Sequence, residues 1–144
     1  MTIVLAATLL TAAACAFINI WLGWRVGQVR MSEKVSVGDG GNMRVIARMR
    51  AHANFVEYTP FALILIGLLE LAKGAQPWIW GYGAVLVVAR IAHGLGMDTW
   101  KPGRTIGVAL TLLLLAVMGI EAGVTAFSGT PTEEALPIET VPAA

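Results

Sequence analysis

Charged residues are scarce in this chain of 144 residues: they make up 13% of it, while hydrophobic residues make up 57%. A soluble domain of this size normally carries about twice that share of charge. Mean hydropathy is also high, at +0.73. The scarcity of charge excludes an ordinary soluble domain and predicts a single-domain integral membrane protein.

Three other features are missing. The one cysteine, Cys15, lies in an apolar segment and has no partner in the chain for a disulfide, so we expect a small buried hydrophobe. No basic run is dense enough to bind nucleic acid, and we predict no metal site. The first apolar segment lacks the basic start of a signal peptide and is longer than its usual apolar core, which favours a retained helix.

Four apolar segments cover about residues 2–24, 53–72, 77–97 and 105–127. Each has roughly 20 residues, enough for a helix to cross the hydrocarbon core of a bilayer. The expected fold class is all-α, an integral membrane four-helix transmembrane bundle made by residues 1–127. Residues 128–144 hold prolines and glutamates but no basic residue, so we expect an acidic, disordered tail.

The links between these segments differ in charge. Residues 25–50 and 98–104 together hold eight of the ten lysines and arginines. The positive-inside rule places both links in the cytoplasm and the two termini on the opposite side. Within the first link, the glycine-rich residues 38–42 predict a turn, and its basic residues are expected on protruding helix ends.

The stretch from Arg50 to Pro60 is unusual because it carries polar groups into an apolar segment. On a helix, Arg50, Asn54 and Glu57 would share one face within about 60°. Ionisable groups are costly at a lipid-facing surface, so this face is expected to point into a bundle or a wet cavity. Further polar groups expected at the same membrane level are Arg30, Arg90, His93, Arg104 and Thr105.

Two structural interpretations compete with a binding site. A ring of arginines that reach the lipid headgroups would explain Arg44 and Arg48, and an ion pair with Arg50 or another arginine would explain Glu57. A binding site would suit a small anionic ligand with an ammonium group, because arginines bind carboxylates and Glu57 could hold the ammonium. Glutathione has this chemistry, as do other peptides and zwitterions.

Two further carboxylates fall near the outer ends of their segments. We expect Glu70 and Glu121 to be interfacial or interhelical partners, with Lys73, and to lie outside the site.

The pattern Arg50-x-x-x-Asn54-x-x-Glu57-Tyr58-x-Pro60 resembles the signature of the membrane-associated proteins in eicosanoid and glutathione metabolism, the MAPEG family. The order of charged groups agrees over about residues 1–127. The resemblance implies a four-helix transmembrane bundle that assembles as a homotrimer. It also implies that glutathione binds between neighbouring subunits at the cytoplasmic side, and that this is a bacterial-type member.

The resemblance assigns roles to individual residues. Arg104 matches an arginine that stabilises the glutathione thiolate, and Thr105 follows where some members carry an assisting serine. Arg30 matches a ligand of a glutathione carboxylate and Glu57 the ligand of its amine. The full set that matches glutathione ligands is Arg30, Arg50, His52, Asn54, Glu57, Tyr58 and His93.

Three positions modify this picture. On an ideal helix His52 points about 160° away from Arg50, so it would serve a neighbouring subunit. Met97 and Val108 stand where family members can carry tyrosines. Two hydroxyl groups near the thiol are therefore missing.

The resemblance implies a glutathione transferase that acts on apolar electrophiles from the bilayer, with glutathione-dependent peroxidase activity as a further expectation. The alternative is a lipid- or glutathione-binding protein of the same fold without turnover, which the missing tyrosines favour. A small four-helix transporter is a third hypothesis. Such transporters usually carry a carboxylate inside the first helix, and this chain has only Asn19 there.

Overall fold

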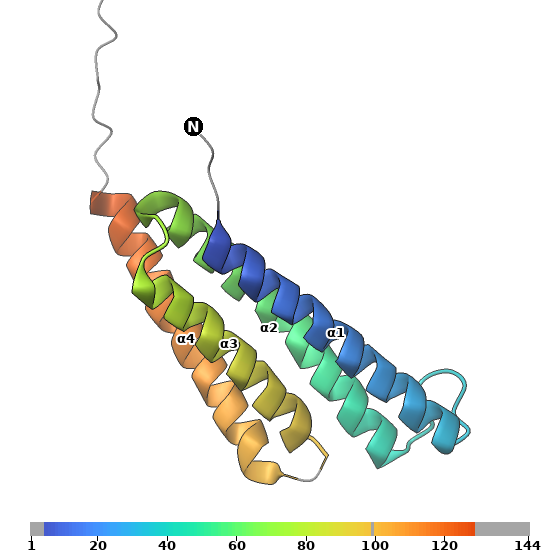
Figure 1. The fold of residues 1–144 in the computed structure, drawn as a ribbon. Helices are drawn as coiled ribbons and strands as arrows, with labels where there is room; N and C mark the ends of the chain where they lie inside the picture. The colour runs from blue at the N-terminus through green and yellow to red at the C-terminus, as the bar shows by residue number, and fades with distance from the viewer. Residues whose placement is uncertain (1–4, 99, 129–144) are drawn as a thin grey trace, which may run out of the picture.

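The computed structural model describes residues 5–98 and 100–128. They form four helices, α1 (Ala6–Ser32), α2 (Met43–Lys73), α3 (Pro77–Gly96) and α4 (Lys101–Ser128), as Figure 1 shows. All four are long and apolar enough to cross a membrane. The predicted all-α, four-helix transmembrane class is therefore confirmed. Apart from Ser128, which ends α4, the predicted acidic tail lies outside the described residues.

The first link is shorter than its polar sequence indicates, because both flanking helices continue into it. Helix α1 runs to Ser32 and α2 begins at Met43, so the arginines of this link lie on helix ends as predicted, while Lys34 lies in the connection itself. Asn42 starts α2 by accepting hydrogen bonds from the backbone N–H groups of Arg44 and Val45, as N-cap residues do. The predicted turn precedes it: its three glycines at 38, 40 and 41 have positive φ angles, which glycine adopts without strain.

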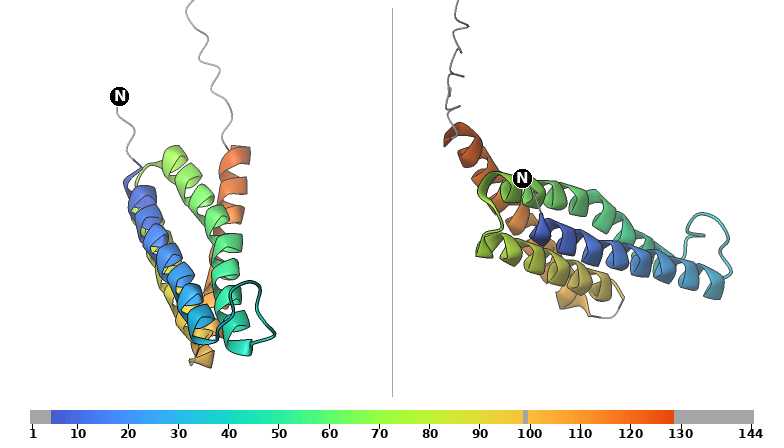
Figure 2. Two further views of the ribbon diagram at one scale, coloured as in Figure 1. Left: turned by 90° about the vertical axis from the view of Figure 1, so that its right-hand side faces the viewer. Right: turned by 45° about the horizontal axis from the view of Figure 1, so that its top comes forward.

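The helices pack as two antiparallel pairs, α1 with α2 and α3 with α4, as Figures 1 and 2 show. Helix α2 also lies against α3 and α4, whereas within the described residues no Cα atom of α1 lies within 8 Å of a Cα atom of α4. The start of α1 and the end of α4 lie at the same end of the bundle as the α2–α3 connection (Figure 1). The two basic links lie at the opposite end, which we call the basic end.

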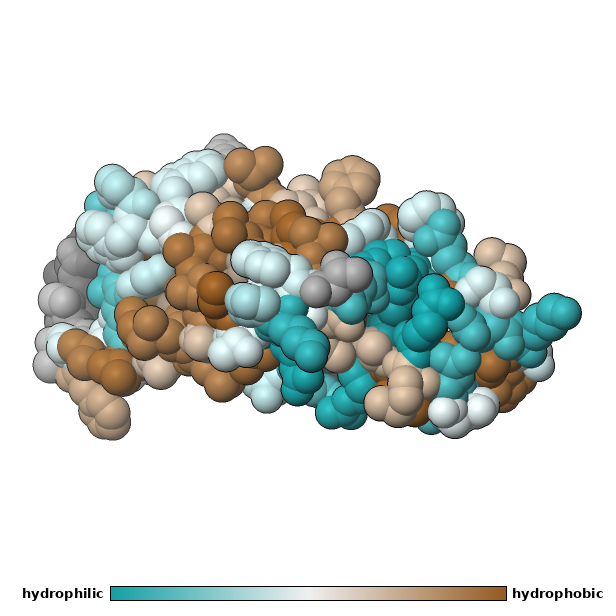
Figure 3. Space-filling model, turned by 90° about the horizontal axis from the view of Figure 1, so that it is seen from below, coloured by the Kyte–Doolittle hydropathy of each residue, from teal (hydrophilic) through white to brown (hydrophobic). Residues whose placement is uncertain are grey.

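A buried apolar core joins all four helices. Leu22 of α1, Ile66 of α2, Leu86 of α3 and Met118 of α4 belong to it. Large apolar side chains such as Phe17 and Phe61 are instead exposed on the outside, where they suit the hydrocarbon of a bilayer. Figure 3 views the molecule from below Figure 1 and shows hydrophilic side chains gathered beside such hydrophobic flanks.

Helices α3 and α4 approach closely beside the basic end. A Cβ atom on Gly107 would lie 2.5 Å from the Ala89 carbonyl oxygen and 2.7 Å from Cβ of His93. Only glycine permits this contact, which agrees with the role of small residues in membrane helix packing. In contrast, a Cβ on Gly119 or Gly123 would meet nothing within 4 Å. The close approach sets the position of His93 relative to α4.

Two carboxylates stabilise the end of the bundle opposite the basic end, which we call the outer end. Glu70 accepts hydrogen bonds from the Ala7 and Thr8 backbone N–H groups, at 2.9 and 2.8 Å, and from the Thr8 hydroxyl at 2.7 Å. Because helix N-termini leave N–H groups unpaired, Glu70 caps α1 from α2. Glu121 pairs with Lys73 at 2.8 Å. The prediction that both carboxylates are interhelical partners is confirmed, and the partner of Lys73 among the described residues is Glu121.

Candidate functional site

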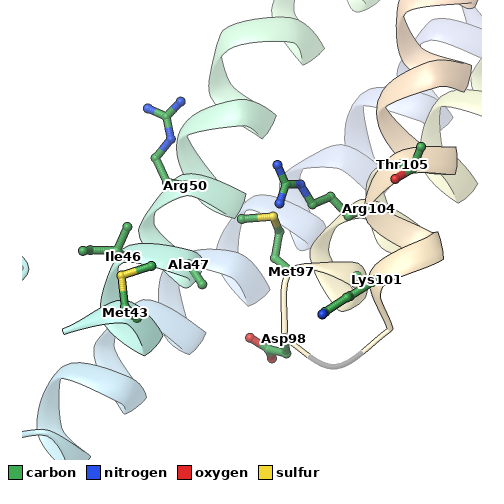
Figure 4. Close-up of a pocket in the computed structure, with 10 residues that line it drawn as sticks. Met43, Ile46, Ala47, Arg50, Met97, Asp98, Lys101, Arg104 and Thr105 are labelled. Carbon is green, nitrogen blue, oxygen red and sulfur yellow. The ribbon is translucent and has the colours of Figure 1, made fainter.

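A cavity of about 610 Å³ lies at the basic end between α2 and the α3–α4 connection. Arg50 of α2 and Arg104 of α4 both line it, on opposite sides of Met97 in the view of Figure 4. Thr105 and Lys101, also of α4, complete its polar lining together with Asp98. The structure thus brings together three of the predicted site residues, Arg50, Arg104 and Thr105.

The charge of this cavity is unbalanced. It has three cationic side chains, of Arg50, Lys101 and Arg104, and one carboxylate, of Asp98. Arg50 and Arg104 are exposed, and neither forms an ion pair with the residues that the structure describes. Such guanidinium groups can bind carboxylates through paired hydrogen bonds or stabilise a thiolate. The cavity is therefore suited to a small anion.

Asp98 is held from the other side. Arg25 of α1 and Arg48 of α2 both form ion pairs with it, Arg48 at 3.1 Å. Arg48 is thus part of an interhelical cluster, whereas the sequence assigned it to a ring of headgroup-seeking arginines. Arg44 pairs with Glu33 instead. The cluster attaches the end of α3 to the α1–α2 pair at the edge of the cavity.

Arg90 of α3, which the sequence placed at the membrane level of the site but not among its ligands, is a polar centre of the bundle. Its side chain is buried, with 1% exposed. It donates hydrogen bonds to Oδ1 of Asn54 at 2.9 Å, to Oγ1 of Thr111 at 2.6 Å and to the Gly107 carbonyl at 3.2 Å. A buried charge is retained only when it is well bonded, so Arg90 joins α2, α3 and α4 behind the cavity. The sequence signal that could have indicated this buried centre is an arginine within an apolar run of α3.

Two predicted ligands, Asn54 and His93, lie near Arg90 rather than in the cavity lining. Asn54 is half-buried and its side-chain oxygen is used by Arg90. His93 is buried, one helical turn after Arg90, and packs beside Gly107. In a single chain, neither residue is among those that line the cavity.

Glu57 and Tyr58 lie further along α2, outside the cavity lining. Glu57 is exposed and Tyr58 half-buried. Glu57 forms no ion pair within the part of the chain that the structure describes, which removes the predicted alternative of an ion pair with Arg50 in a single chain. The carboxylate is thus available at the surface of α2.

Arg30 and His52 lie on the α1–α2 side, away from the cavity. Nε2 of His52 is hydrogen-bonded to Oδ1 of Asn19 on α1, at 2.8 Å. Arg30 lies 3.5 Å from the sulfur of Met49, and neither residue lines the cavity. This agrees with the helical geometry that pointed His52 away from Arg50. A single chain therefore does not unite the predicted set of ligands.

Comparison with known proteins agrees with the residue pattern. The sequence model of the MAPEG family matches residues 8–124. The inner membrane protein YecN of Escherichia coli strain K12 is 29% identical over 116 residues, which cover 77% of this chain and 88% of the relative. The protein of the same name from Escherichia coli O6:H1 matches to the same extent.

Proposed function

Because this chain belongs to the MAPEG family, we propose that it is a membrane-bound glutathione transferase that joins the thiolate of glutathione to apolar electrophiles from the bilayer. Four apolar helices, and relatives that are inner membrane proteins, make it a multi-pass protein of a bacterial inner membrane. The cofactor of the proposed reaction is glutathione, and the second substrate is an apolar or lipid electrophile. By the positive-inside rule, the site faces the cytoplasm.

The observation that carries this proposal is the cationic cavity. Arg50 and Arg104 line one space from different helices, and each is free of ion pairs with the described residues. Glutathione brings two carboxylates and a thiol, so one guanidinium can hold a carboxylate while another favours the thiolate. Glu57, exposed on α2, is then the partner for the glutathione ammonium.

In the proposed reaction, Arg104 lowers the free energy of the thiolate, and the hydroxyl of Thr105 donates a hydrogen bond to the sulfur. The thiol proton leaves to water. The sulfur forms a bond to the electrophilic carbon, and the leaving group departs with its bonding electrons. With a lipid hydroperoxide, the same thiolate would cleave the O–O bond, giving an alcohol and a sulfenic acid that a second glutathione converts into disulfide and water.

A second copy of the chain would complete the site. Arg30 and His52 lie on the α1–α2 side, whereas Arg50 and Arg104 line the cavity beside α3 and α4. If the α1–α2 side of one copy packs against the cavity of the next, Arg30 and His52 of the first copy face the same ligand as the cavity arginines of the second. Head-to-tail contacts form a closed ring when the rotation between copies closes, and the family resemblance implies that this ring is a homotrimer.

A non-enzymatic, glutathione- or lipid-binding role is the second candidate. It is favoured by Met97, which lines the cavity without the hydroxyl group that a tyrosine would supply. A thioether is a weak hydrogen-bond acceptor and cannot donate a proton to a product. In this case the cavity would bind glutathione without turnover.

The test is glutathione binding to the detergent-purified protein, with conjugation to a generic aryl halide measured in parallel. We expect binding, an ultraviolet thiolate signal and turnover in the wild type, and weaker binding in Arg50→Ala. Arg44→Ala is the matched control, because Arg44 lies on the same helix and pairs with Glu33. Absence of both binding and thiolate signal would exclude the transferase. Binding without turnover of aryl halides or hydroperoxides would favour the second candidate.

A further inference from the structure

Asp98 is the only carboxylate found among the cavity-lining residues of the described chain. Its two oxygens are held from outside the cavity. Arg25 donates to Oδ2, while Arg48 donates from Nε to Oδ1 at 3.1 Å and lies 3.1 Å from Oδ2. In the view of Figure 4, Met97 lies between Asp98 and the guanidinium of Arg104.

The two arginines are themselves fixed. Arg25 is buried, donates to the Gly94 carbonyl at 2.9 Å, and lies over the ring of Trp21 at 4.5 Å from its centroid. Arg48 donates to the backbone carbonyl of Arg25 at 3.2 Å. Since charged hydrogen bonds and a cation–π contact restrict both guanidinium groups, they form a rigid clamp. We call Arg25 and Arg48 the Asp98 clamp.

Without the clamp, Asp98 would compete for the cations of its own cavity. It shares the cavity with Arg50, Lys101 and Arg104 and carries the same functional group as a ligand carboxylate. A group attached to the site competes at a high effective concentration, commonly in the millimolar range or above. Neutralisation by two external arginines removes this competitor.

We propose that the Asp98 clamp sets the affinity of the cavity for its anion: by holding Asp98 at the edge, it leaves Arg50, Lys101 and Arg104 free to bind the ligand. This inference rests on the proposed function, with glutathione as the anion. Arg25, Arg48 and Asp98 are therefore positioning residues that act through the cavity arginines. The sequence pattern gave Arg25 and Asp98 no role and explained Arg48 only as one of a ring of arginines that reach the lipid headgroups.

The test compares the glutathione affinity of wild type, Arg48→Gln and the double variant Arg48→Gln/Asp98→Asn. Arg48 is chosen because its side chain is 24% exposed, whereas that of Arg25 is 8% exposed and is more important for folding. We expect Arg48→Gln to weaken binding about fivefold, the scale of one partly exposed charge pair. The double variant should return to within about twofold of wild type, because the competing carboxylate is gone.

Arg44→Gln is the matched control, since it removes an arginine of α2 whose partner, Glu33, does not line the cavity. We expect less than about a twofold change there. An equal loss in Arg48→Gln and Arg44→Gln, or a double variant that is not restored, would overturn the proposal. If Arg48 acted only by attaching α2 to Asp98, that attachment would be missing from the double variant too, and binding would stay weak.

Asp98→Asn alone gives an independent result if Arg48→Gln does not fold. Binding should be unchanged or tighter, because the variant cannot compete for the cations. Binding weakened more than about fivefold in folded Asp98→Asn would make Asp98 a ligand of the glutathione ammonium and overturn the proposal. Failure of the wild type to bind glutathione would overturn the proposed function itself, so the two failures are distinguishable.

Discussion

The two ends of the bundle handle charge in opposite ways. At the outer end, Glu70 and Glu121 accept hydrogen bonds from several groups each: Glu70 from Ala7 and Thr8, and Glu121 from Lys73, Trp78 and Tyr82. At the basic end, the cavity has three cations and a single carboxylate, which two further arginines already neutralise.

This difference distinguishes polar groups that stabilise the fold from polar groups that are available to bind a ligand. Groups that satisfy one another stabilise a membrane bundle, because an unpaired polar group in hydrocarbon is costly. A cluster whose cations exceed its carboxylates lowers its free energy further only by binding an anion. Variants at the basic end should therefore change ligand binding and catalysis, and variants at the outer end should change stability.

Arg104→Ala should give the largest effect. We expect the conjugation rate to fall about a hundredfold or more, the usual loss when a group that stabilises developing charge is removed. Glutathione affinity should stay within about threefold of wild type, because Arg50 still holds a carboxylate. Rate and affinity are measured on the same detergent-purified sample. An affinity loss as large as the rate loss would refute the separate role of Arg104.

Glu70→Ala should produce the next largest effect, now at the outer end. Three donors, including the Ala7 and Thr8 N–H groups, lose their acceptor. We expect a loss of about 2–3 kcal/mol in the free energy of unfolding, because buried donors would stay unpaired. Thermal unfolding in detergent measures this. Glutathione affinity of the folded fraction should equal that of wild type, and a change there would contradict the separation of the two ends.

The comparison also shows what sequence can predict. The four helices follow from hydropathy, and the direction of His52 from helical geometry, since both depend on residues near one another in the chain. The clamp could not be predicted, because Arg25 and Asp98 are 73 positions apart and their pairing depends on how α1 and α3 pack. The apolar segment ended near residue 24, and α1 continues to Ser32 through its charged end, as the prediction of protruding helix ends requires.

The predicted glutathione ligands on α2 also show which features depend on local sequence and which depend on helix packing. Helical spacing placed Arg50, Asn54 and Glu57 on one face, but it could not say what each side chain meets. Arg90 bonds Asn54 from within the bundle, while Arg50 lines the cavity and Glu57 is exposed. Three residues of one face thus meet three environments, which only the packing of α3 and α4 determines.

Glu57→Gln is expected to have a smaller effect than either variant above. It should weaken glutathione binding about tenfold, the loss of one charge-assisted contact to the ammonium. The maximal rate should change little, because Glu57 does not contact the sulfur. Titration with glutathione and with an analogue that lacks the amino group shows whether Glu57 contacts the ammonium or affects binding in another way. If the variant and wild type discriminate equally between these ligands, the exposed carboxylate of Glu57 does not hold the amine.

Lys73→Met should have the smallest effect and is the sharpest test of the comparison. Lys73 is a cation in an ion pair, like Arg48, but it pairs with Glu121 at the outer end, and the two side chains are 32% and 18% exposed. An ion pair of this exposure contributes less than about 1 kcal/mol to stability. We therefore expect a small decrease in melting temperature and unchanged glutathione affinity. If removing this cation weakened glutathione binding as much as removing Arg48, binding would respond to total charge rather than to the cavity, and the distinction between the two ends would be lost.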